Sequence, residues 1–212
     1  MKHLILLLSL LVSTSCMETT ETPKQEKQTP KPSSPKTNQS IKQSRVQSIR
    51  ALFEESPKFI AKGFDFPVGK PNAKGYYNAQ GFGKNLHLGD DWNAVTGGDS
   101  DLGDPIFSVA NGYVHFARNL KGGWGKVVRV WHLTDDNKLV ESLYAHCEEI
   151  LIEPNRFVQK GQQIATIGNA GGLYPAHLHL EMRDDVNLPI GPGYSRDRKG
   201  YLDPTAFIKE NR

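Results

Sequence analysis

Short β-rich runs separated by turn residues occupy the chain from residue 104 to residue 183, and they limit the folds that it can adopt. Two runs, 126–133 and 138–147, flank the sequence TDDN, which favours a hairpin turn. The run 104–118 has Asn111-Gly112 at its centre, which is a second hairpin signal. Further strands are expected at 162–168 and 177–183. Many short strands joined by close turns favour an antiparallel sandwich or a barrel-like sheet.

An internal echo repeats one of these runs. The spacing of Gly103, Ile106 and Val109 in GDPIFSVANG is that of Gly161, Ile164 and Ile167 in GQQIATIGNAG. Each copy has a glycine turn followed by apolar residues on one face, so we expect two similar β-motifs that pack together. Helical periodicity is limited to about 46–55 and 204–211, which predicts only a few short peripheral helices.

The first sixteen residues, MKHLILLLSLLVSTSC, have the layout of an export signal. Lys2 supplies the positive start, and the apolar stretch that follows is too short to span a bilayer. Cys16 resembles the acylated cysteine of a bacterial lipoprotein signal, although Ser13 stands where Leu is usual. The alternative is ordinary signal-peptidase cleavage after Ser15. Both alternatives place the protein outside the cytoplasm, and lipidation of Cys16 would anchor it to a membrane.

Residues 17–50 are rich in Pro, Lys, Thr, Gln and Ser and have almost no apolar residues. Such a segment cannot bury enough apolar surface to offset the entropy of folding, so we expect a disordered tether. The chain has a formal net charge of +3, of which Lys2 carries +1, residues 17–50 carry +4 and residues 51–212 carry −2. The basic balance lies in the tether, which argues against a nucleic-acid-binding domain. The folded domain is expected from about residue 56 to residue 212.

Three short motifs contain residues that can bind a metal or transfer a proton. In HLHLE, an extended backbone would place His177 and His179 on one face of a strand, with side chains about 6–7 Å apart. HLGDD contributes His87 and Asp91, which can share an ion if the glycine between them lets the backbone bend. YAH contributes His146.

His87, Asp91 and His179 offer two neutral imidazoles and one carboxylate, a donor set that suits Zn²⁺ with an open fourth position. His146 and His177 remain as unligated imidazoles, and histidine can act as a general base near neutral pH. The sequence has no His-Glu-x-x-His segment, so the glutamate base of that metalloprotease design is missing. A zinc centre with a histidine base is therefore the predicted site.

The motifs HLGDD, YAH and HLHLE resemble the three signature motifs of the lysostaphin-like (LytM-type) zinc endopeptidases. The resemblance extends over about residues 64–210, and it includes FDFPVG, GDPIFSVANGYV, FVQKGQQIATIGNAG and LDPTAFI. It implies a mainly β fold with an antiparallel β-sheet groove of the duplicated hybrid-motif type. It also implies hydrolysis of peptide bonds in peptidoglycan, at cross-bridges or stems. Carried over by position, it makes His87, Asp91 and His179 the ligands of one Zn²⁺ and His146 and His177 the catalytic pair, either of which can be the base.

The expected protein is thus a lipid-anchored zinc endopeptidase in the cell envelope of a bacterium, or a secreted one if Cys16 is not lipidated. A different functional class exists within the resembled family, because members that have lost zinc ligands bind and activate separate wall amidases. All five ligand and catalytic positions are occupied here, which favours the enzyme. A sugar-transport phosphocarrier is similar only in the hybrid-motif fold, and the export signal and Asp91 argue against it.

Several residues near the expected groove are candidates for contact with the substrate. They are Tyr76, Tyr77 and Asn85, which precede the first motif, and Tyr194 and Arg196 in the loop 186–200. Glu181 shares a face with His179 and is a candidate to hold that imidazole by a hydrogen bond. Cys147 stands where the resembled family usually has an apolar residue, and we expect it to face the core.

Overall fold

The computed structural model describes residues 35–212, with side chains from residue 38 onward. The predicted export signal, Cys16 and residues 17–34 of the expected tether lie outside the described residues. The helices are α1 (Pro35–Glu55) and α2 (Pro204–Glu210), and the strands are β1 (Tyr76–Gln80), β2 (Asp90–Ala94), β3 (Pro105–Phe107), β4 (Gly112–Lys121), β5 (Gly125–Leu133), β6 (Leu139–Cys147), β7 (Arg156–Val158), β8 (Gln163–Thr166), β9 (Leu178–Arg183) and β10 (Tyr201–Leu202). Short helical turns occur at Pro57–Phe59, Gly69–Ala73, Lys84–Leu86 and Gly122–Trp124.

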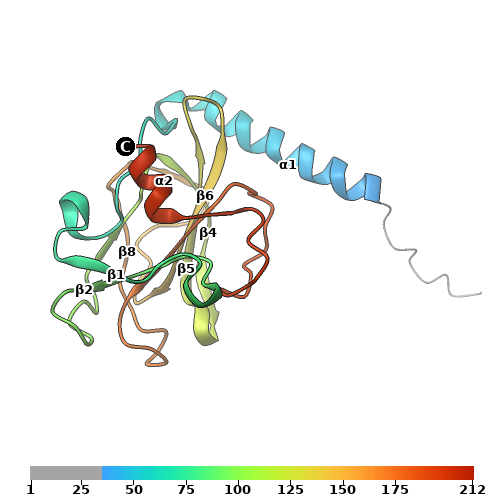
Figure 1. Cartoon of the computed structure of the whole chain (residues 1–212). Coiled ribbons are helices and arrows are strands. Elements are labelled where there is room, and N and C mark those ends of the chain that lie inside the picture. Colours follow the sequence, from blue (N-terminus) through green and yellow to red (C-terminus); the bar gives the residue numbers. More distant parts are fainter. Residues whose placement is uncertain (1–34) are drawn as a thin grey trace, which may run out of the picture. The chain divides into compact units, whose positions relative to one another are not determined.

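Most of the strands form one large antiparallel sheet (Figure 1). Its order is β1-β2-β9-β6-β5-β4-β7, and β10 pairs with the end of β9 that β2 leaves free. The hairpin expected around TDDN is present as β5 and β6, which pair along most of their length. The prediction of a mainly β, antiparallel fold with a few peripheral helices is confirmed.

The two echoed motifs pair with each other in a second, two-stranded sheet. β3 and β8 are antiparallel, with Ile106 opposite Ala165. The amide of Gly103 donates to the carbonyl of Ile167, and the amide of Gly161 donates to that of Ser108, each at 2.8 Å. The prediction of two similar β-motifs that pack together is confirmed. Their apolar residues join the main core with residues of β5, β6 and β9.

The hairpin predicted at Asn111-Gly112 is wrong, because β3 and β4 belong to different sheets. The dipeptide does turn the chain, but the turn passes from one sheet to the other. The side chain of Asn111 donates to the carbonyl of Lys58 at 3.2 Å and accepts from the amide of Lys160 at 2.8 Å. Gly112 is needed for packing, because a Cβ there would lie 2.6 Å from the side chain of Val130.

Helix α1 corrects part of the expected tether. Residues 35–50, which the composition assigns to a disordered segment, are helical and run without a break into the helix expected at 46–55. Ile49 and Phe53, one turn apart, are buried against Leu133 and Val186. Composition averages over the segment and misses this apolar stripe on one helical face. Among residues 35–212, no helix combines the length and apolar character needed to cross a membrane.

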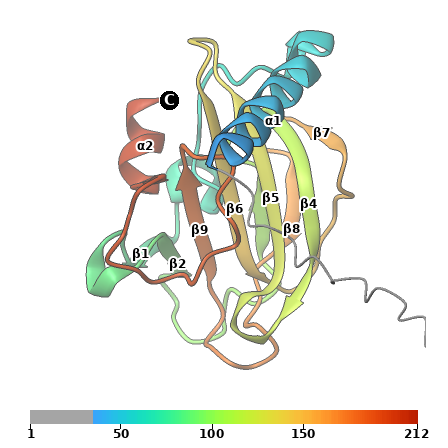
Figure 2. The same ribbon diagram turned by 90° about the vertical axis from the view of Figure 1, so that its right-hand side faces the viewer.

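One side of the large sheet, which we call the groove face, carries both apolar and charged residues. Glu141, Leu143 and Ala145 alternate along β6 and stand opposite Arg183, Glu181 and His179 of β9. Figure 2 shows α1 lying across the sheet and the segment after β9 running along it. The contacts of α1 with Trp131 and of the segment after β9 with Arg183 place both on the groove face.

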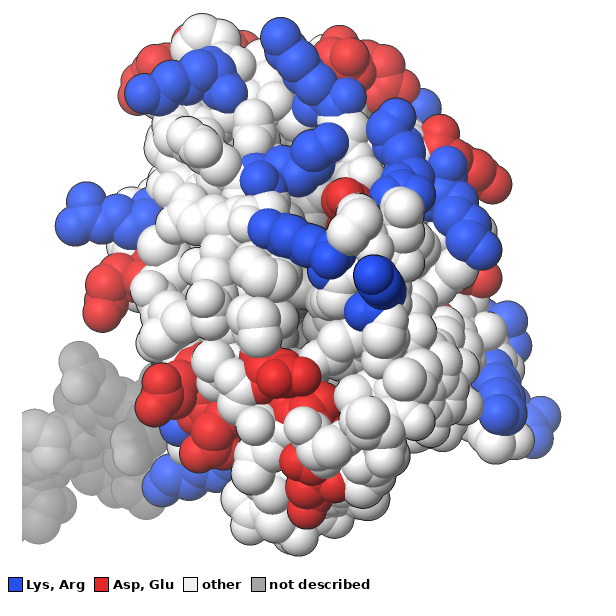
Figure 3. Space-filling model, turned by 90° about the vertical axis from the view of Figure 1, so that its left-hand side faces the viewer, with Lys and Arg blue, Asp and Glu red and all other residues white. Residues whose placement is uncertain are grey.

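Charged side chains of both signs lie on the face of the molecule that Figure 3 shows. On this side, which faces left in Figure 1, a group of Asp and Glu lies in the lower part and most Lys and Arg lie above it, with both signs also present at the top and along the edges. Such a mixture of signs is typical of a solvated surface.

Candidate metal centre and histidine pair

The pairing of β2 with β9 brings Asp91 and His179 to the groove face as direct partners. Residues opposite each other in an antiparallel pair have Cβ atoms about 5 Å apart. Gly89 allows the chain before β2 to approach β9, because a Cβ there would lie 2.4 Å from the carbonyl oxygen of Leu180. His87 lies two residues earlier and reaches the same point. Gly89 is therefore needed because the backbone there passes too close to β9 to leave room for a side chain.

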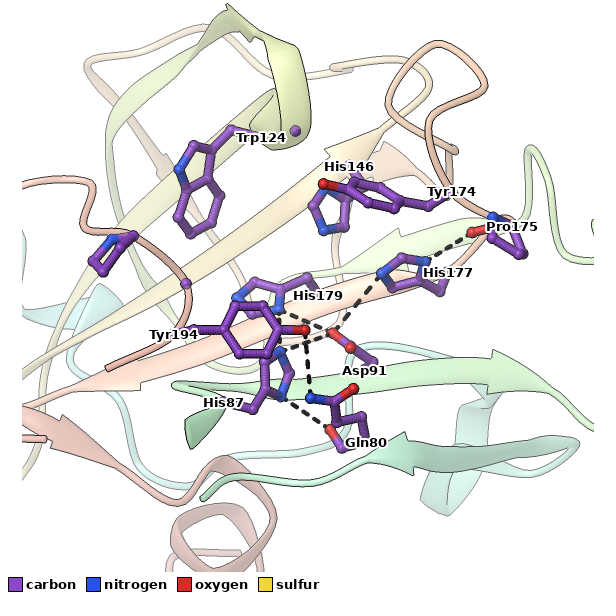
Figure 4. Close-up of a pocket in the computed structure, with 13 residues that line it drawn as sticks. Gln80, His87, Asp91, Trp124, His146, Tyr174, Pro175, His177, His179 and Tyr194 are labelled. Carbon is purple, nitrogen blue, oxygen red and sulfur yellow. Dashed lines mark hydrogen bonds and ion pairs between the residues drawn. The ribbon is translucent and has the colours of Figure 1, made fainter. Parts of the chain in front are cut away.

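Three donor atoms converge in this corner of the sheet (Figure 4). Nε2 of His87 lies 3.0 Å from Nδ1 of His179 and 3.3 Å from Oδ1 of Asp91. Nδ1 of His179 lies 2.9 Å from the same carboxylate oxygen. Both histidines are buried, and Asp91 is half-buried at the pocket floor. Within residues 35–212, these three are the group placed closely enough to hold a metal ion.

The outer nitrogen of each imidazole has an acceptor of its own. Nδ1 of His87 faces the backbone carbonyl of Gln80 at 3.1 Å, and Nε2 of His179 faces Oε1 of Glu181 at 3.2 Å. Protons assigned to these two nitrogens leave lone pairs on the inner nitrogens, both directed at Asp91. Two lone pairs and a carboxylate at such distances repel one another, so the donor set fits a bound cation. Nitrogen and carboxylate donors with one open side match Zn²⁺.

The pKa values in the corner follow from the same contacts. Burial alone would raise the pKa of Asp91, but hydrogen bonds from His179 and His87 outweigh it and hold that pKa well below its usual range. Burial alone would lower the pKa of His179, but the carboxylates of Asp91 and Glu181 raise it to about 9. The two carboxylates therefore favour a positive charge in this corner, either as a proton on the imidazole or as a bound cation.

A backbone irregularity at the end of β6 turns His146 into the pocket. Strict alternation would place it on the face of Ser142 and Tyr144, which are buried on the core side. The β5–β6 pairing shifts register near His146, whose φ is +60°. A bulge of this kind redirects a side chain. A positive φ is costly for a residue other than glycine, and such strain is concentrated at functional sites.

His177 lies just before β9, beside His146. The two ring centroids are 4.7 Å apart. Nδ1 of His177 is 2.8 Å from the carbonyl oxygen of Pro175, and Nε2 is 3.8 Å from Oδ1 of Asp91. Burial lowers the pKa of His146 to about 3, so that imidazole is neutral near pH 7. The structure thus gathers the four histidines and the one aspartate singled out in the sequence, while their roles as ligands and catalysts stay predictions.

The five residues line one pocket of about 350 Å³ whose walls are aromatic. Trp124 comes from the turn between β4 and β5, Tyr174 from the loop before β9 and Tyr194 from the loop after it (Figure 4). Their ring centroids lie 5.6 Å from His179, 5.2 Å from His146 and 5.0 Å from His87, respectively. Sequence reasoning missed Trp124 and Tyr174. The available signal was an aromatic residue one or two positions after a Gly-Gly pair, in GGW and GGLY.

Four other substrate-contact candidates lie outside this pocket. Tyr76 is half-buried, and its hydroxyl donates to Asp104 at 2.5 Å. Tyr77 is exposed on β1, Asn85 lies in the turn before His87, and Arg196 is not part of the pocket lining. Contact of these residues with a longer substrate stays a prediction.

Cys147 is buried in the core, as expected. Burial raises the pKa of its thiol to about 12, so the thiol is uncharged and unreactive at neutral pH.

An antiparallel sheet that gathers two histidines and an aspartate as convergent donors, with two more histidines beside them, defines a β-protein with a candidate mononuclear metal centre. A family model described as Peptidase family M23 matches residues 86–192, half of the chain, and the chain belongs to this family. The resemblance based on the three motifs is therefore confirmed.

Several curated relatives share this region. The chain is 40% identical over 81 residues to a protein of Yersinia enterocolitica named Lipoprotein NlpD, covering 38% of this chain and 78% of that one. It is 36% identical over 81 residues to the Murein hydrolase activator NlpD of Escherichia coli, covering 38% of this chain and 20% of the relative. It is 30% identical over 106 residues to the Peptidoglycan DD-endopeptidase ShyB of Vibrio cholerae, covering 46% of this chain and 24% of the relative.

A solved structure supports the fold independently. A chain of the SpoIIQ–SpoIIIAH pore-forming complex superposes with a TM-score of 0.52 at 19% identity, covering 69% of this chain and 91% of that chain. At this level of identity the similarity concerns the fold alone.

Proposed function

We propose that the chain is a zinc endopeptidase that hydrolyses peptide bonds in peptidoglycan cross-links. The observation that carries this proposal is the convergence of two imidazole lone pairs and one carboxylate beside two further histidines that have no place among the donors. Membership of a peptidase family supports the reaction type. The relative named as a peptidoglycan DD-endopeptidase supports the substrate class.

Nε2 of His87, Oδ1 of Asp91 and Nδ1 of His179 would hold the ion. When bound, zinc would supply Lewis-acid polarisation of the scissile carbonyl and would lower the pKa of the attacking water. The protein's own contribution is to accept the outer N–H of each imidazole, through the Gln80 carbonyl and the Glu181 carboxylate, so that the inner nitrogens are directed at the ion.

His177 is the better placed of the two free histidines to act as general base. Its Nδ1–H donates to the Pro175 carbonyl at 2.8 Å, which leaves a lone pair on Nε2. That nitrogen faces the candidate metal donors, 3.8 Å from Oδ1 of Asp91. It can therefore take a proton from a water at the open side of the site and later deliver it to the leaving amine.

His146 has the complementary role of a hydrogen-bond donor. Its low pKa, about 3, keeps the imidazole neutral, and its Nδ1 is buried without a partner among the described residues. A neutral imidazole held in a strained backbone conformation can direct an N–H at the carbonyl oxygen of the substrate, where negative charge develops. Trp124 and Tyr174, on either side of it, exclude water from that oxygen.

The proposed location is the bacterial cell envelope, with Cys16 as the lipid anchor. The export signal in the sequence and the relative named as a lipoprotein support this location. Peptidoglycan is then the nearest abundant polymer with peptide cross-links.

A second candidate function is activation of a separate wall hydrolase. The similarity to a protein named as a murein hydrolase activator favours it. In that case the pocket would bind a partner protein or a wall fragment without cleaving it.

Digestion of purified sacculi by the full chain separates the two. The zinc-loaded chain should release cross-link fragments, identified by mass, and a zinc chelator or Asp91→Ala should abolish the release. Inhibitors directed at serine or thiol nucleophiles should have no effect. If folded, zinc-loaded protein releases nothing alone but raises the product yield of a purified wall amidase, the activator function replaces the enzyme function.

A further inference from the structure

The side chain of Arg183 is fully buried on the groove face, four residues after His179 on β9. Its guanidinium donates in two directions. Nε and Nη2 both reach Oε2 of Glu181, at 2.8 and 2.5 Å, and Nη1 lies 3.5 Å from Oε1 of Glu141. Nη1 and Nη2 also donate to the backbone carbonyls of Pro189 and Ile190, at 2.9 and 2.7 Å.

In the first direction, Arg183 acts on a candidate metal donor through Glu181. Oε2 of that carboxylate is held by Arg183, while Oε1 accepts from Nε2 of His179 at 3.2 Å. Glu181 is fully buried, so its charge needs this partner. The orientation of the His179 imidazole therefore depends on a carboxylate whose own position depends on Arg183.

In the second direction, Arg183 holds the loop that closes the pocket. Pro189 and Ile190 come just before Gly193 and Tyr194, which line the pocket. The carbonyl of Gly193 accepts from the amide of Leu88 at 2.9 Å, next to His87. The amide of Ser195 donates to the carbonyl of Leu86 at 2.8 Å. The loop thus connects Arg183 with the backbone on both sides of the other candidate histidine donor.

Resting on the zinc site proposed above, we propose that Arg183 is a positioning residue that couples the orientation of His179 to the placement of the loop 189–195. A single planar group with five N–H donors can serve both sides at once, which a lysine ammonium cannot do. The coupling makes the geometry of the metal donors and the shape of the pocket wall depend on each other.

Arg129 offers a matched control on the same face. It bonds Oε1 of Glu141 at 2.7 Å and donates to the carbonyl of Leu188 at 2.8 Å, but it does not contact Glu181. It is buried like Arg183, with 7% of its surface exposed. Loss of a buried guanidinium in general should therefore affect both arginines alike, whereas positioning of His179 should be specific to Arg183.

The experiment compares Arg183→Lys, Glu181→Gln and Arg129→Lys in the full chain. Zinc affinity is measured by competition with a chelating dye, and exchange of the Leu88 and Ser195 amides is measured by hydrogen exchange without metal. Arg183 acts on His179 only through Glu181, and Arg183→Lys should nevertheless weaken zinc binding by about tenfold. Glu181→Gln, which does not touch the loop, should speed exchange of both amides. Arg129→Lys should keep the zinc affinity of the wild type.

Wild-type zinc affinity in Arg183→Lys, or wild-type exchange in Glu181→Gln, would overturn the proposal. An equal loss of zinc affinity in Arg129→Lys would do the same, because the effect would then follow from the loss of any buried guanidinium on this face. If Arg183→Lys does not fold, the exchange of Ser195 in Glu181→Gln still decides. A wild-type chain that binds no zinc would refute the proposed function, and the exchange measurement would still test the hold of Arg183 on the loop.

Discussion

His87 and His179 turn two nitrogens, Nε2 and Nδ1, toward each other at 3.0 Å, and each of the outer nitrogens faces a fixed acceptor. Two imidazoles at this distance need either a proton or a cation between them. The nearby carboxylate of Asp91 favours the positive charge in both cases. The corner is therefore a site where protons and metal ions compete.

The first prediction concerns metal content. The purified chain should bind about one Zn²⁺ per molecule, because three donors converge with one open side. Asp91→Ala and His179→Ala should abolish this binding in elemental analysis. His115→Ala is the matched control, since His115 lies on the groove face against Glu141 and Trp131 and should leave the zinc content unchanged. Full retention of zinc in both site variants would refute the donor set.

The second prediction separates the donors from the histidine pair. His177→Ala and His146→Asn should keep zinc and lower the rate of peptide hydrolysis by about 10²–10⁴-fold. Asparagine is chosen at position 146 because it tolerates the φ of +60° found there. Elemental analysis and a melting curve check that metal and fold are intact. Loss of zinc together with activity would make the altered residue a metal ligand.

The sequence singles out five residues that the fold brings together, because they lie in short motifs, while their roles stay predictions. His87 and Asp91 fall in one motif and His179 in another, and the register of β2 against β9 joins them. The sequence does not predict the local backbone geometry of the site. Alternation puts His146 on the wrong face, since a bulge with positive φ is not visible in residue types. The sequence also does not identify Trp124 and Tyr174 as walls of the pocket, because both lie in turns and line it together with residues that are distant in the sequence.

The fold shows the same division. Strand runs and the two echoed motifs are read from local patterns, and both are present. Asn111-Gly112 gives a correct turn but a wrong hairpin, because a turn signal does not say which sheet receives the next strand. Helix α1 is only half expected, because its burial depends on Leu133 and Val186, far away in the chain.

The third prediction tests the packing of α1. Phe53 is fully buried and contacts the ring of Phe157 edge-on, with centroids 5.7 Å apart. Phe53→Ala should lower the free energy of unfolding by about 3 kcal/mol, measured by denaturant titration. Ile41→Ala, on the exposed part of the same helix, should change it by less than about 0.5 kcal/mol. Equal effects of the two variants would contradict the docking of α1.

The fourth prediction concerns the lipid anchor. If Cys16 is acylated, the full chain should appear in the membrane fraction of cells, and Cys16→Ala should move it to the soluble envelope fraction. Cys147→Ala is the matched control, because that thiol is buried in the core and has no part in anchoring. Unchanged fractionation of Cys16→Ala would exclude acylation as the means of attachment.

The last prediction is a pH dependence of stability that originates away from the pocket. His132 is fully buried between the carbonyl of Asn111 and the hydroxyl of Ser142, at 2.8 and 2.7 Å, and burial lowers its pKa to about 4. In the unfolded chain its pKa is about 6.5, so between that pH and pH 4 the unfolded state binds a proton that the folded state does not bind. Above pH 6.5 the imidazole of His132 therefore does not lower the free energy of unfolding. As the pH falls from 6.5 toward 4, proton binding to the unfolded chain lowers this free energy by on the order of 3 kcal/mol in total.

His132→Gln isolates this effect from the carboxylates and the other histidines, which titrate in both proteins. Denaturant titrations of the two proteins from pH 7 to pH 4 should show the stability of the wild type falling more steeply than that of the variant. The difference should develop between pH 6.5 and pH 4, where the wild type has one more buried imidazole to protonate than the variant. Parallel curves over that range would mean that the imidazole of His132 accepts a proton without opening the core, and would contradict its burial as a neutral group.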